Sequence, residues 1–229
     1  MKIKFSDRGV TLIELLVVMV IAGMVVAGFY RIFIAQSKAY AVQDQVAEVQ
    51  QNIRNVMEVL VRDLSMAGFD YDSSTSAVNI PNTPYQVTGN SITVWYEYYQ
   101  KDPDNPLGPP LTSEIHAVNY TLNGSSLERQ LTVNGGNTTA EEILRNVDAF
   151  DLTCGIDGRI GDDATQDGVV DTWVNCGAVD MNRDKVIAVR VNLTARPEQA
   201  NPQDDRLRTI TPRTLSSTVA LRNPALKKM

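Results

Sequence analysis

Hydrophobic residues are concentrated in one stretch near the N-terminus. From Val10 to Tyr30 the chain is apolar except for Thr11, Glu14 and two glycines. A helix of that length can cross a bilayer core of about 30 Å. A carboxylate near the start of such a span costs roughly 2.5 kcal/mol or more unless it lies shallow or finds a partner. The pattern therefore predicts a transmembrane helix in which Glu14 is the anomaly.

After residue 34 the apolar pattern narrows to one face of a helix. Apolar residues recur at spacings of three and four, at Ala39, Val42, Val46, Val49, Ile53, Val56, Leu60 and Leu64. This spacing predicts an amphipathic helix over residues 35–67, packed on a globular head, with a free two-stranded coiled coil as the alternative. No proline interrupts Val10 to Ala67, and Gly68 signals the end, so we expect one continuous helix.

Strand patterns and turn residues follow the helix. Residues 91–99 are the clearest strand, and Asn123-Gly124 forms the tip of an expected hairpin. A short helix is expected over 140–145, loops over 70–84 and 102–110, and further strands over 147–154, 185–196 and 213–222. The expected fold class is α+β, with a long N-terminal helix packed on an antiparallel sheet of about five or six strands.

Composition and charge narrow the possible functions. The chain has 229 residues and a formal net charge of −6, with no basic run interleaved with aromatic residues, so no nucleic-acid partner is expected. The single histidine, His116, lies on a predicted strand without a nucleophile elbow, a phosphate loop or a His-Glu metal motif. We therefore expect a protein that is not an enzyme and that has no cofactor, calcium aside.

Charges and cysteines indicate the orientation in a membrane. Lys2, Lys4 and Arg8 precede the apolar run, which places them on the cytoplasmic side and the head beyond the membrane. In that compartment Cys154 and Cys176 are expected to form a disulfide, and two separately buried thiols are the alternative. A secretory signal has its cleavage site after a shorter apolar core. Here the glycine precedes the apolar run, so a cut at that point would remove only the basic leader.

Gly9 followed by V-T-L-I-E-L-L-V resembles the class III signal of type IV pilins and type II secretion pseudopilins. The resemblance implies that a prepilin peptidase cuts after Gly9 and methylates the new N-terminal residue, Val10, where the family most often has Phe. It also implies that Glu14, the fifth mature residue, serves assembly with other pilins or pseudopilins. Physically, the acid of one chain can pair with the α-amine of the next and so fix the axial register. A plain anchor with an incidental Glu is the alternative.

Three further stretches, residues 62–70, 146–157 and 185–196, resemble the PilW-type minor pilins. Similar features occur in the pseudopilin J class of type II secretion. The resemblance implies a minor subunit at the initiation or tip of a type IV pilus, first in the inner membrane with a periplasmic head and later in the fibre at the cell surface. The expected segments are a leader (1–9), a transmembrane and assembly half-helix (10–34), the amphipathic half-helix (35–67) and the head (68–229).

Two alternatives to this function remain open. The first is a minor pseudopilin of a type II secretion system. The second is a membrane-anchored binding module. It would bind a ligand through an acidic loop or through the predicted strand 91–99, called here the aromatic strand. The aromatic residues of that strand alternate, so one face is expected in the core and the other can face a ligand: Trp95, Tyr96, Tyr98 and Tyr99.

The acidic loop occupies the segment 154–184. Oxygen ligands spaced by one or two residues, with glycines for tight turns, are typical of calcium loops. The candidate ligands are Asp157, Asp162, Asp163, Asp167, Asp171, Asp180, Asn182 and Asp184. The last three start like a calcium loop but lack the glycine at position six and the Glu at position twelve. A solvated acidic loop, tied at its ends by the cysteines, is the alternative.

Overall fold

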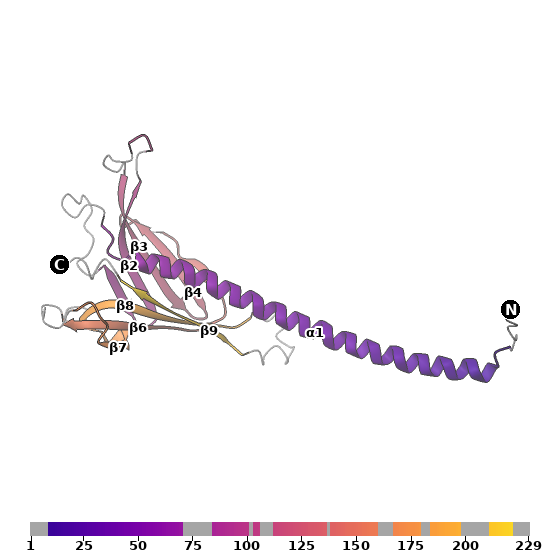
Figure 1. The fold of residues 1–229 in the computed structure, drawn as a ribbon. Helices are drawn as coiled ribbons and strands as arrows, with labels where there is room; N and C mark the ends of the chain where they lie inside the picture. Colours follow the sequence, from indigo (N-terminus) through magenta and orange to yellow (C-terminus); the bar gives the residue numbers. More distant parts are fainter. Residues whose placement is uncertain are drawn as a thin grey trace, which may run out of the picture. The chain divides into compact units, whose positions relative to one another are not determined.

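The computed structural model describes residues 9–70, 84–100, 103–105, 112–136, 138–159, 167–179, 184–197 and 211–221. The chain divides into two compact units, Met1–Val46 and Ala47–Met229. The long helix α1 (Leu12–Ser65) begins in the first unit and ends in the second (Figure 1). The predicted continuous helix is therefore confirmed, with each end within two residues of the expected bounds.

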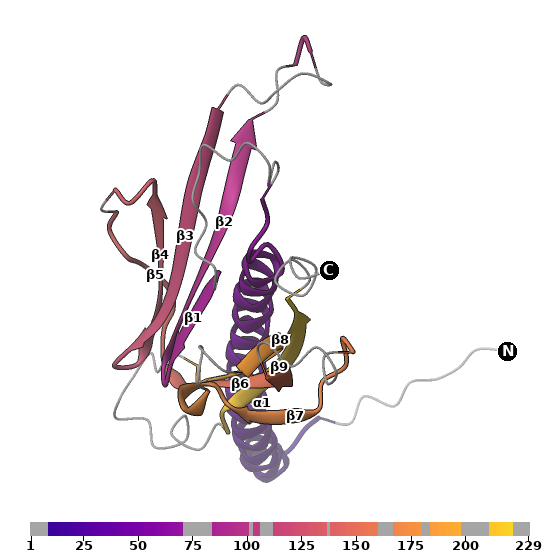
Figure 2. The ribbon, with the colours of Figure 1, turned by 90° about the vertical axis from the view of Figure 1, so that its left-hand side faces the viewer.

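The second unit contains two antiparallel sheets. The first sheet follows chain order, and its strands are β1 (Tyr85–Thr88), β2 (Ser91–Gln100), β3 (Thr112–Asn123), β4 (Ser126–Val133) and β5 (Glu141–Leu144). The second sheet has the order β7-β6-β8-β9, with the strands β6 (Val147–Arg159), β7 (Thr172–Asn175), β8 (Asp184–Ala195) and β9 (Arg213–Ala220). A short 3-10 helix, η1 (Cys176–Ala178), follows β7. In Figure 2 the strands of the two sheets run in clearly different directions.

Two turns connect these strands in conformations that favour glycine or asparagine. Gly124 has a φ of 62° at the tip of the β3–β4 hairpin, which confirms the predicted turn. Asn146 has a φ of 53° between β5 and β6. Because asparagine tolerates the left-handed region, the chain can turn there within two residues from the first sheet to the second.

The core of the second unit lies between α1 and both sheets. The buried apolar residues of the helix are Val49, Ile53, Val56, Met57, Leu60 and Leu64. They belong to one cluster with residues of both sheets, such as Val118 and Leu193, which are fully buried. Burial of each such side chain contributes about 1.5–3 kcal/mol relative to exposure. The predicted packing of the helix on the head is confirmed from Val49 onward.

The chain leaves the helix through a backbone connection to β2. Gly68, with a φ of 72°, donates its N–H to the carbonyl of Trp95 at 2.8 Å, and Glu97 donates to the carbonyl of Phe69 at 2.8 Å. A glycine in the left-handed conformation just after the last turn is a common helix terminator. The predicted role of Gly68 is therefore confirmed, and the residues after the helix continue along the edge of β2 beyond β1.

Two predictions of the fold are wrong. The described residues form nine strands in two sheets, and not one sheet of five or six. The segment predicted as a helix over 140–145 contains β5, because pairing with β4 places Leu144 opposite Leu127 in the core. This tertiary pairing overrides the helix propensity of Glu and Leu. Most of the loops predicted at 70–84 and 102–110, and residues 1–8, lie outside the described residues.

Candidate functional site

The first turn of α1 is closed by Thr11. The backbone N–H of Glu14 donates to Thr11 Oγ1 at 3.4 Å, and the N–H of Leu15 donates to the Thr11 carbonyl at 3.2 Å. Thr11-x-x-Glu14 has the residue types of a capping box, a signal that the sequence contains and that the prediction missed. Gly9 and Val10 lie before the helix, so the predicted new N-terminus is two residues away from its first residue.

The carboxylate of Glu14 is exposed in this first turn. Among the residues that the structure describes, it has no hydrogen-bond or ion-pair partner. The positive end of the helix dipole favours a negative charge at this position. Its apolar neighbours Leu12 and Ile13 are 81% and 70% exposed. The acid is thus available to a partner outside the chain.

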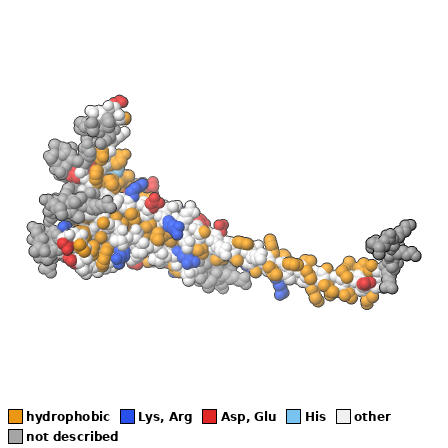
Figure 3. All heavy atoms as spheres, viewed as in Figure 1, with side chains coloured by type: hydrophobic (Ala, Val, Ile, Leu, Met, Phe, Trp, Pro, Cys, Tyr) orange, Lys and Arg blue, Asp and Glu red, His pale blue; other side chains and the backbone are white. Residues whose placement is uncertain are grey.

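A continuous apolar surface surrounds the helix beyond Glu14. Figure 3 shows hydrophobic side chains along this part of α1. The exposed ones of its first turns include Leu15, Leu16, Val17, Val18, Met19, Val20, Ile21, Met24, Val25 and Val26. A helix that is hydrophobic all round requires lipid or other apolar surfaces around it. By length and composition, α1 can cross a membrane.

A buried acid, Asp63, attaches the other end of α1 to the first sheet. Its side chain is 3% exposed. The hydroxyl of Tyr120 on β3 donates to Asp63 Oδ2 at 2.6 Å, and Arg129 on β4 donates to the same oxygen from Nη2 at 2.9 Å and from Nε at 3.1 Å. Arg62 lies 3.5 Å from the other oxygen. One carboxylate thereby joins the helix to two strands.

The surroundings of this cluster raise the pKa of Tyr120 and that of Arg129. Burial, together with the hydrogen bond to Asp63, raises the pKa of Tyr120 well above its usual value, so the phenol stays neutral. Burial alone would lower the pKa of Arg129, but its hydrogen bonds to Asp63 and Tyr120 outweigh burial and raise it. The sequence prediction missed Asp63, although an acid three residues after Leu60 and four before Ala67 lies on the core-facing stripe.

The predicted disulfide is confirmed. Cys154 on β6 is bonded to Cys176 in η1, and both residues are buried. The next residue, Gly155, lies under Trp173 of β7. A Cβ at this position would meet the side chain of Val170 at 2.9 Å and that of Trp173 at 3.2 Å, so β7 can lie this close only above a glycine.

Removal of the disulfide is expected to lower the free energy of unfolding by about 3 kcal/mol, because the bond closes a loop with a sequence separation of 22. The variant is the double substitution Cys154→Ala with Cys176→Ala. Urea unfolding of the detergent-solubilised full chain, followed by tryptophan fluorescence, measures the change. Wild-type protein under a reductant is the control and should match the variant. An unchanged unfolding midpoint in both would contradict the prediction.

Asp157 and Asp171, two of the acids proposed as calcium ligands, accept hydrogen bonds from the backbone of their own segment. Asp157 is fully buried and accepts from the N–H groups of Asp167 at 3.2 Å and Gly168 at 3.1 Å. It also lies 3.6 Å from Lys185 Nζ. Asp171 accepts from the N–H of Gly158 at 3.0 Å. These carboxylates accept hydrogen bonds from backbone N–H groups in the turns of the segment, so the acids have a structural role.

The remaining candidate ligands are only partly described. Asp162, Asp163, Asp180 and Asn182 lie outside the described residues, and Asp184 begins β8. Within the described segments, no group of three or more His, Cys, Asp or Glu side chains is placed to hold a metal ion. Binding of calcium stays a prediction.

The predicted alternation along β2 holds up to Tyr96 and fails at Tyr98, which lies two residues further on the same face. Tyr96 is buried, whereas Tyr98 is 52% exposed and stacks on His116 of β3, with ring centroids 4.8 Å apart. Burial, opposed by Glu114 at 3.7 Å, lowers the pKa of His116, so its imidazole is neutral at pH 7. His116 is a packed strand residue.

Two family models match the chain. One is described as type IV pilus-assembly protein W and matches residues 117–223. It covers β4 to β9 and most of β3, and it ends just after β9. The other is the prokaryotic N-terminal methylation motif, which matches residues 4–30 and includes Gly9, Val10 and Glu14. The two matches therefore cover both the apolar start of the helix and most of the sheets.

One curated protein and one solved structure also match the chain. The chain is 31% identical over 129 residues to the pilin-like protein PilA3 of Thermus thermophilus, and the alignment covers 53% of this chain and 52% of that protein. The chain thus spans about half the length of this curated relative. A solved type IV-like pilin of Thermus thermophilus matches with a TM-score of 0.45 and 13% identity, over 76% of this chain and 96% of the other.

The assignment rests on the sequence matches. The methylation motif lies on the segment that forms the exposed, apolar beginning of α1, and the assembly-protein match lies on the sheets that pack against its end. By these matches the chain is similar to type IV pilin-like proteins: its N-terminal segment matches the prokaryotic methylation motif, and residues 117–223 match the type IV pilus-assembly protein W family.

Proposed function

We propose that this protein is a minor pilin-like subunit that takes part in the assembly of a type IV pilus, at its initiation or its tip. The observation that carries the proposal is an exposed apolar helix with an unpartnered acid in its first turn, joined to a PilW domain. Such a helix is suited to lie first in lipid and then among identical or related helices. The PilW match favours a pilus over a type II secretion fibre.

Processing at the N-terminus supplies the second half of the assembly element. A prepilin peptidase cuts after Gly9 and methylates Val10, which leaves a positive amine just before the helix. Glu14 lies one helical turn from this amine. In a bundle of such helices the acid of one subunit pairs with the amine of its neighbour, because an unpaired charge in hydrocarbon is costly in any other register.

The proposed location follows from charge and redox chemistry. Lys2, Lys4 and Arg8 hold the leader on the cytoplasmic side of the inner membrane, and the head lies in the periplasm before it enters the fibre. The disulfide between Cys154 and Cys176 supports this location, because such bonds persist in oxidising compartments. The partners are other pilins and the prepilin peptidase, and the subunit itself catalyses no reaction.

Replacement of Gly9 with valine is expected to leave the leader attached, because the bulky side chain blocks the bond that the peptidase cleaves. Mass spectrometry of the N-terminal peptide measures this. Wild-type protein should begin at methylated Val10, and the variant should begin at Met1. The matched control is Gly23→Ala in the apolar part of α1, which should be processed like wild type. A wild-type chain that keeps its leader would overturn the proposed processing.

A further inference from the structure

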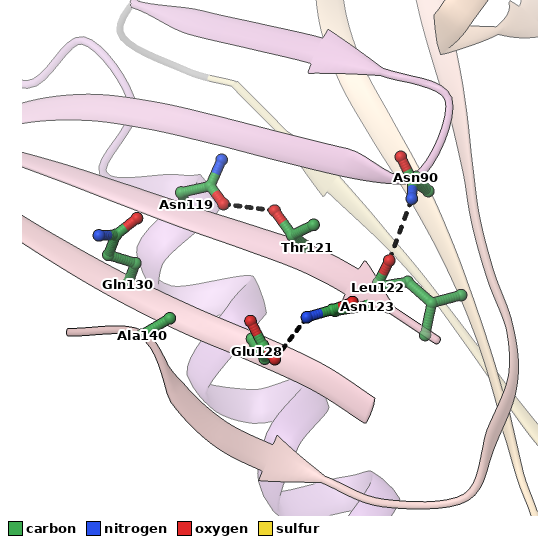
Figure 4. Close-up of a pocket in the computed structure, with 8 residues that line it drawn as sticks. All are labelled: Asn90, Asn119, Thr121, Leu122, Asn123, Glu128, Gln130 and Ala140. Atoms are coloured by element: carbon green, nitrogen blue, oxygen red, sulfur yellow. Dashed lines mark hydrogen bonds between the residues drawn. The ribbon is translucent and has the colours of Figure 1, made fainter. Parts of the chain in front are cut away.

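A polar cavity of about 340 Å³ opens on the first sheet (Figure 4). It lies on the face opposite to the core, since the side chains of Val118 and Tyr120 point inward and the residues next to them on β3 point outward. Six of its lining residues are polar: Asn90, Asn119, Thr121, Asn123, Glu128 and Gln130. Its volume is at the lower end of the range for ligand sites, about 300–1,000 Å³.

The strand register brings these side chains together in two rows. In one row Thr121 of β3 lies opposite Glu128 of β4, and in the next Asn119 lies opposite Gln130. Figure 4 shows their side chains on neighbouring strands around the same space. Every second residue of a strand lies on the same face of the sheet. A shift of the register by one residue would move these side chains of one strand to the opposite face, so the cavity depends on the observed register.

Hydrogen bonds within the cavity hold several of these side chains in place. Asn119 donates from Nδ2 to Thr93 Oγ1 at 2.6 Å and to Ser91 Oγ at 3.1 Å, and its Oδ1 accepts from Thr121. Asn123 donates to Glu128 Oε1 at 3.0 Å. A site whose rotamers are already ordered loses less entropy when a ligand binds.

The groups that remain are mostly acceptors. Gln130 uses its Nε2 to donate to the carbonyl of Thr138 at 2.6 Å, which leaves its Oε1 as an acceptor. Glu128 Oε2 and Asn123 Oδ1 are further acceptors without a partner in the described part of the chain. A ligand that matches them must present several donors at fixed positions, as the hydroxyl groups of a sugar ring do.

The charge of the cavity argues against anionic ligands. Among the lining residues that the structure describes, Glu128 is the one that is charged, and none is a lysine or an arginine. An anion would therefore lose its hydration without gaining a cation. The half-buried Trp95 lies on the same face, one row beyond Thr93 and opposite the small Ala117. An indole there offers an apolar surface for the C–H face of a second ring.

We propose that this cavity binds a neutral saccharide of one or two rings. Asn123, Glu128 and Gln130 accept hydrogen bonds from its hydroxyl groups, and Asn119 keeps the floor of the site in shape. The proposal concerns the first sheet alone and does not depend on the proposed role in pilus assembly.

The test uses the detergent-solubilised full chain in lauryldimethylamine oxide, a detergent without a sugar group. Saturation-transfer NMR and calorimetry are carried out with a panel of neutral mono- and disaccharides, including glucose, galactose, lactose, maltose and cellobiose. Sialyllactose and single-stranded dT15 are the anionic probes. We expect a neutral sugar to bind with a Kd below about 10 mM, and Gln130→Ala and Asn119→Ala to weaken it at least tenfold.

The matched control is Asn192→Ala on β8. Asn192 is a half-buried amide between the buried Val191 and Leu193, so it faces away from the core on the other sheet. Its removal should leave binding unchanged. The proposal is overturned if no neutral sugar of the panel binds, if Gln130→Ala binds as wild type does, or if an anionic probe binds more tightly than every neutral one. Since the assay needs no fibre, any of these results leaves the proposed pilus function intact.

Discussion

Replacement of Glu14 with alanine is expected to produce a chain that is processed and retained in the membrane but is at least tenfold depleted from sheared fibres. Alanine keeps the helix, since it has the highest helix propensity, and it keeps the apolar surface. In the proposed assembly, it removes the partner for the α-amine of a neighbouring subunit. The cost of an unpaired charge near hydrocarbon, roughly 2.5 kcal/mol, corresponds to more than a tenfold change in an equilibrium constant.

Quantitative immunoblots of the fibre and membrane fractions measure this effect, with the mass of the N-terminal peptide recorded in parallel. Glu58→Ala is the matched control, because Glu58 is an exposed acid of the same helix in the second unit. It should enter fibres at the wild-type level. If Glu14→Ala enters fibres as wild type does, the pairing of Glu14 with an α-amine is wrong. A variant that keeps its leader would instead place the role of Glu14 in processing.

The helix could be predicted almost completely from the sequence. Its two halves carry different patterns, continuous apolar residues first and a spacing of three and four later, and both patterns depend only on residues close together in the chain. Glu14 was found for the same reason, as one charge within a local apolar run. The neighbouring residues in the sequence are enough to identify Glu14 as an unusual charge, so no knowledge of the tertiary structure is needed.

The short strands could not be predicted in this way. β5 and β7 have four residues each, and neither has an alternating apolar pattern of its own. β5 is a strand because Leu144 meets Leu127 of β4, and β7 is one because Trp173 lies over Gly155 of β6. Both causes are contacts between strands, so they appear only once the neighbouring strands are in register.

The same distinction explains which site residues were missed. Asp63 is separated from Tyr120 by 57 residues and from Arg129 by 66, so no local pattern indicates that they meet. The polar residues of the cavity come from the turn before β2, from β3 and from β4, and only the observed register brings them together. Gly9, Val10 and Glu14 instead form a motif of contiguous residues, which a family comparison detects directly.

The carboxylate of Asp63 joins the end of α1 to β3 and β4 through Tyr120 and Arg129. Replacement of Asp63 with alanine is expected to lower the free energy of unfolding of the second unit by about 3 kcal/mol. The substitution leaves Arg129 without its buried partner and the hydroxyl of Tyr120 without its acceptor. Urea unfolding of the detergent-solubilised full chain, followed by tryptophan fluorescence, measures the change.

Two further variants separate the cluster from its surroundings. Tyr120→Phe removes only the hydroxyl, so a smaller loss of about 1–2 kcal/mol is expected. Arg62→Ala removes an exposed guanidinium that lies 3.5 Å from Asp63, and exposed pairs of this kind contribute less than about 1 kcal/mol. If Asp63→Ala were no more destabilising than Arg62→Ala, the attachment would rest on apolar packing alone. The expected order, with Asp63→Ala the most destabilising and Arg62→Ala the least, instead makes the buried carboxylate the link between the helix that assembles and the sheets that it carries.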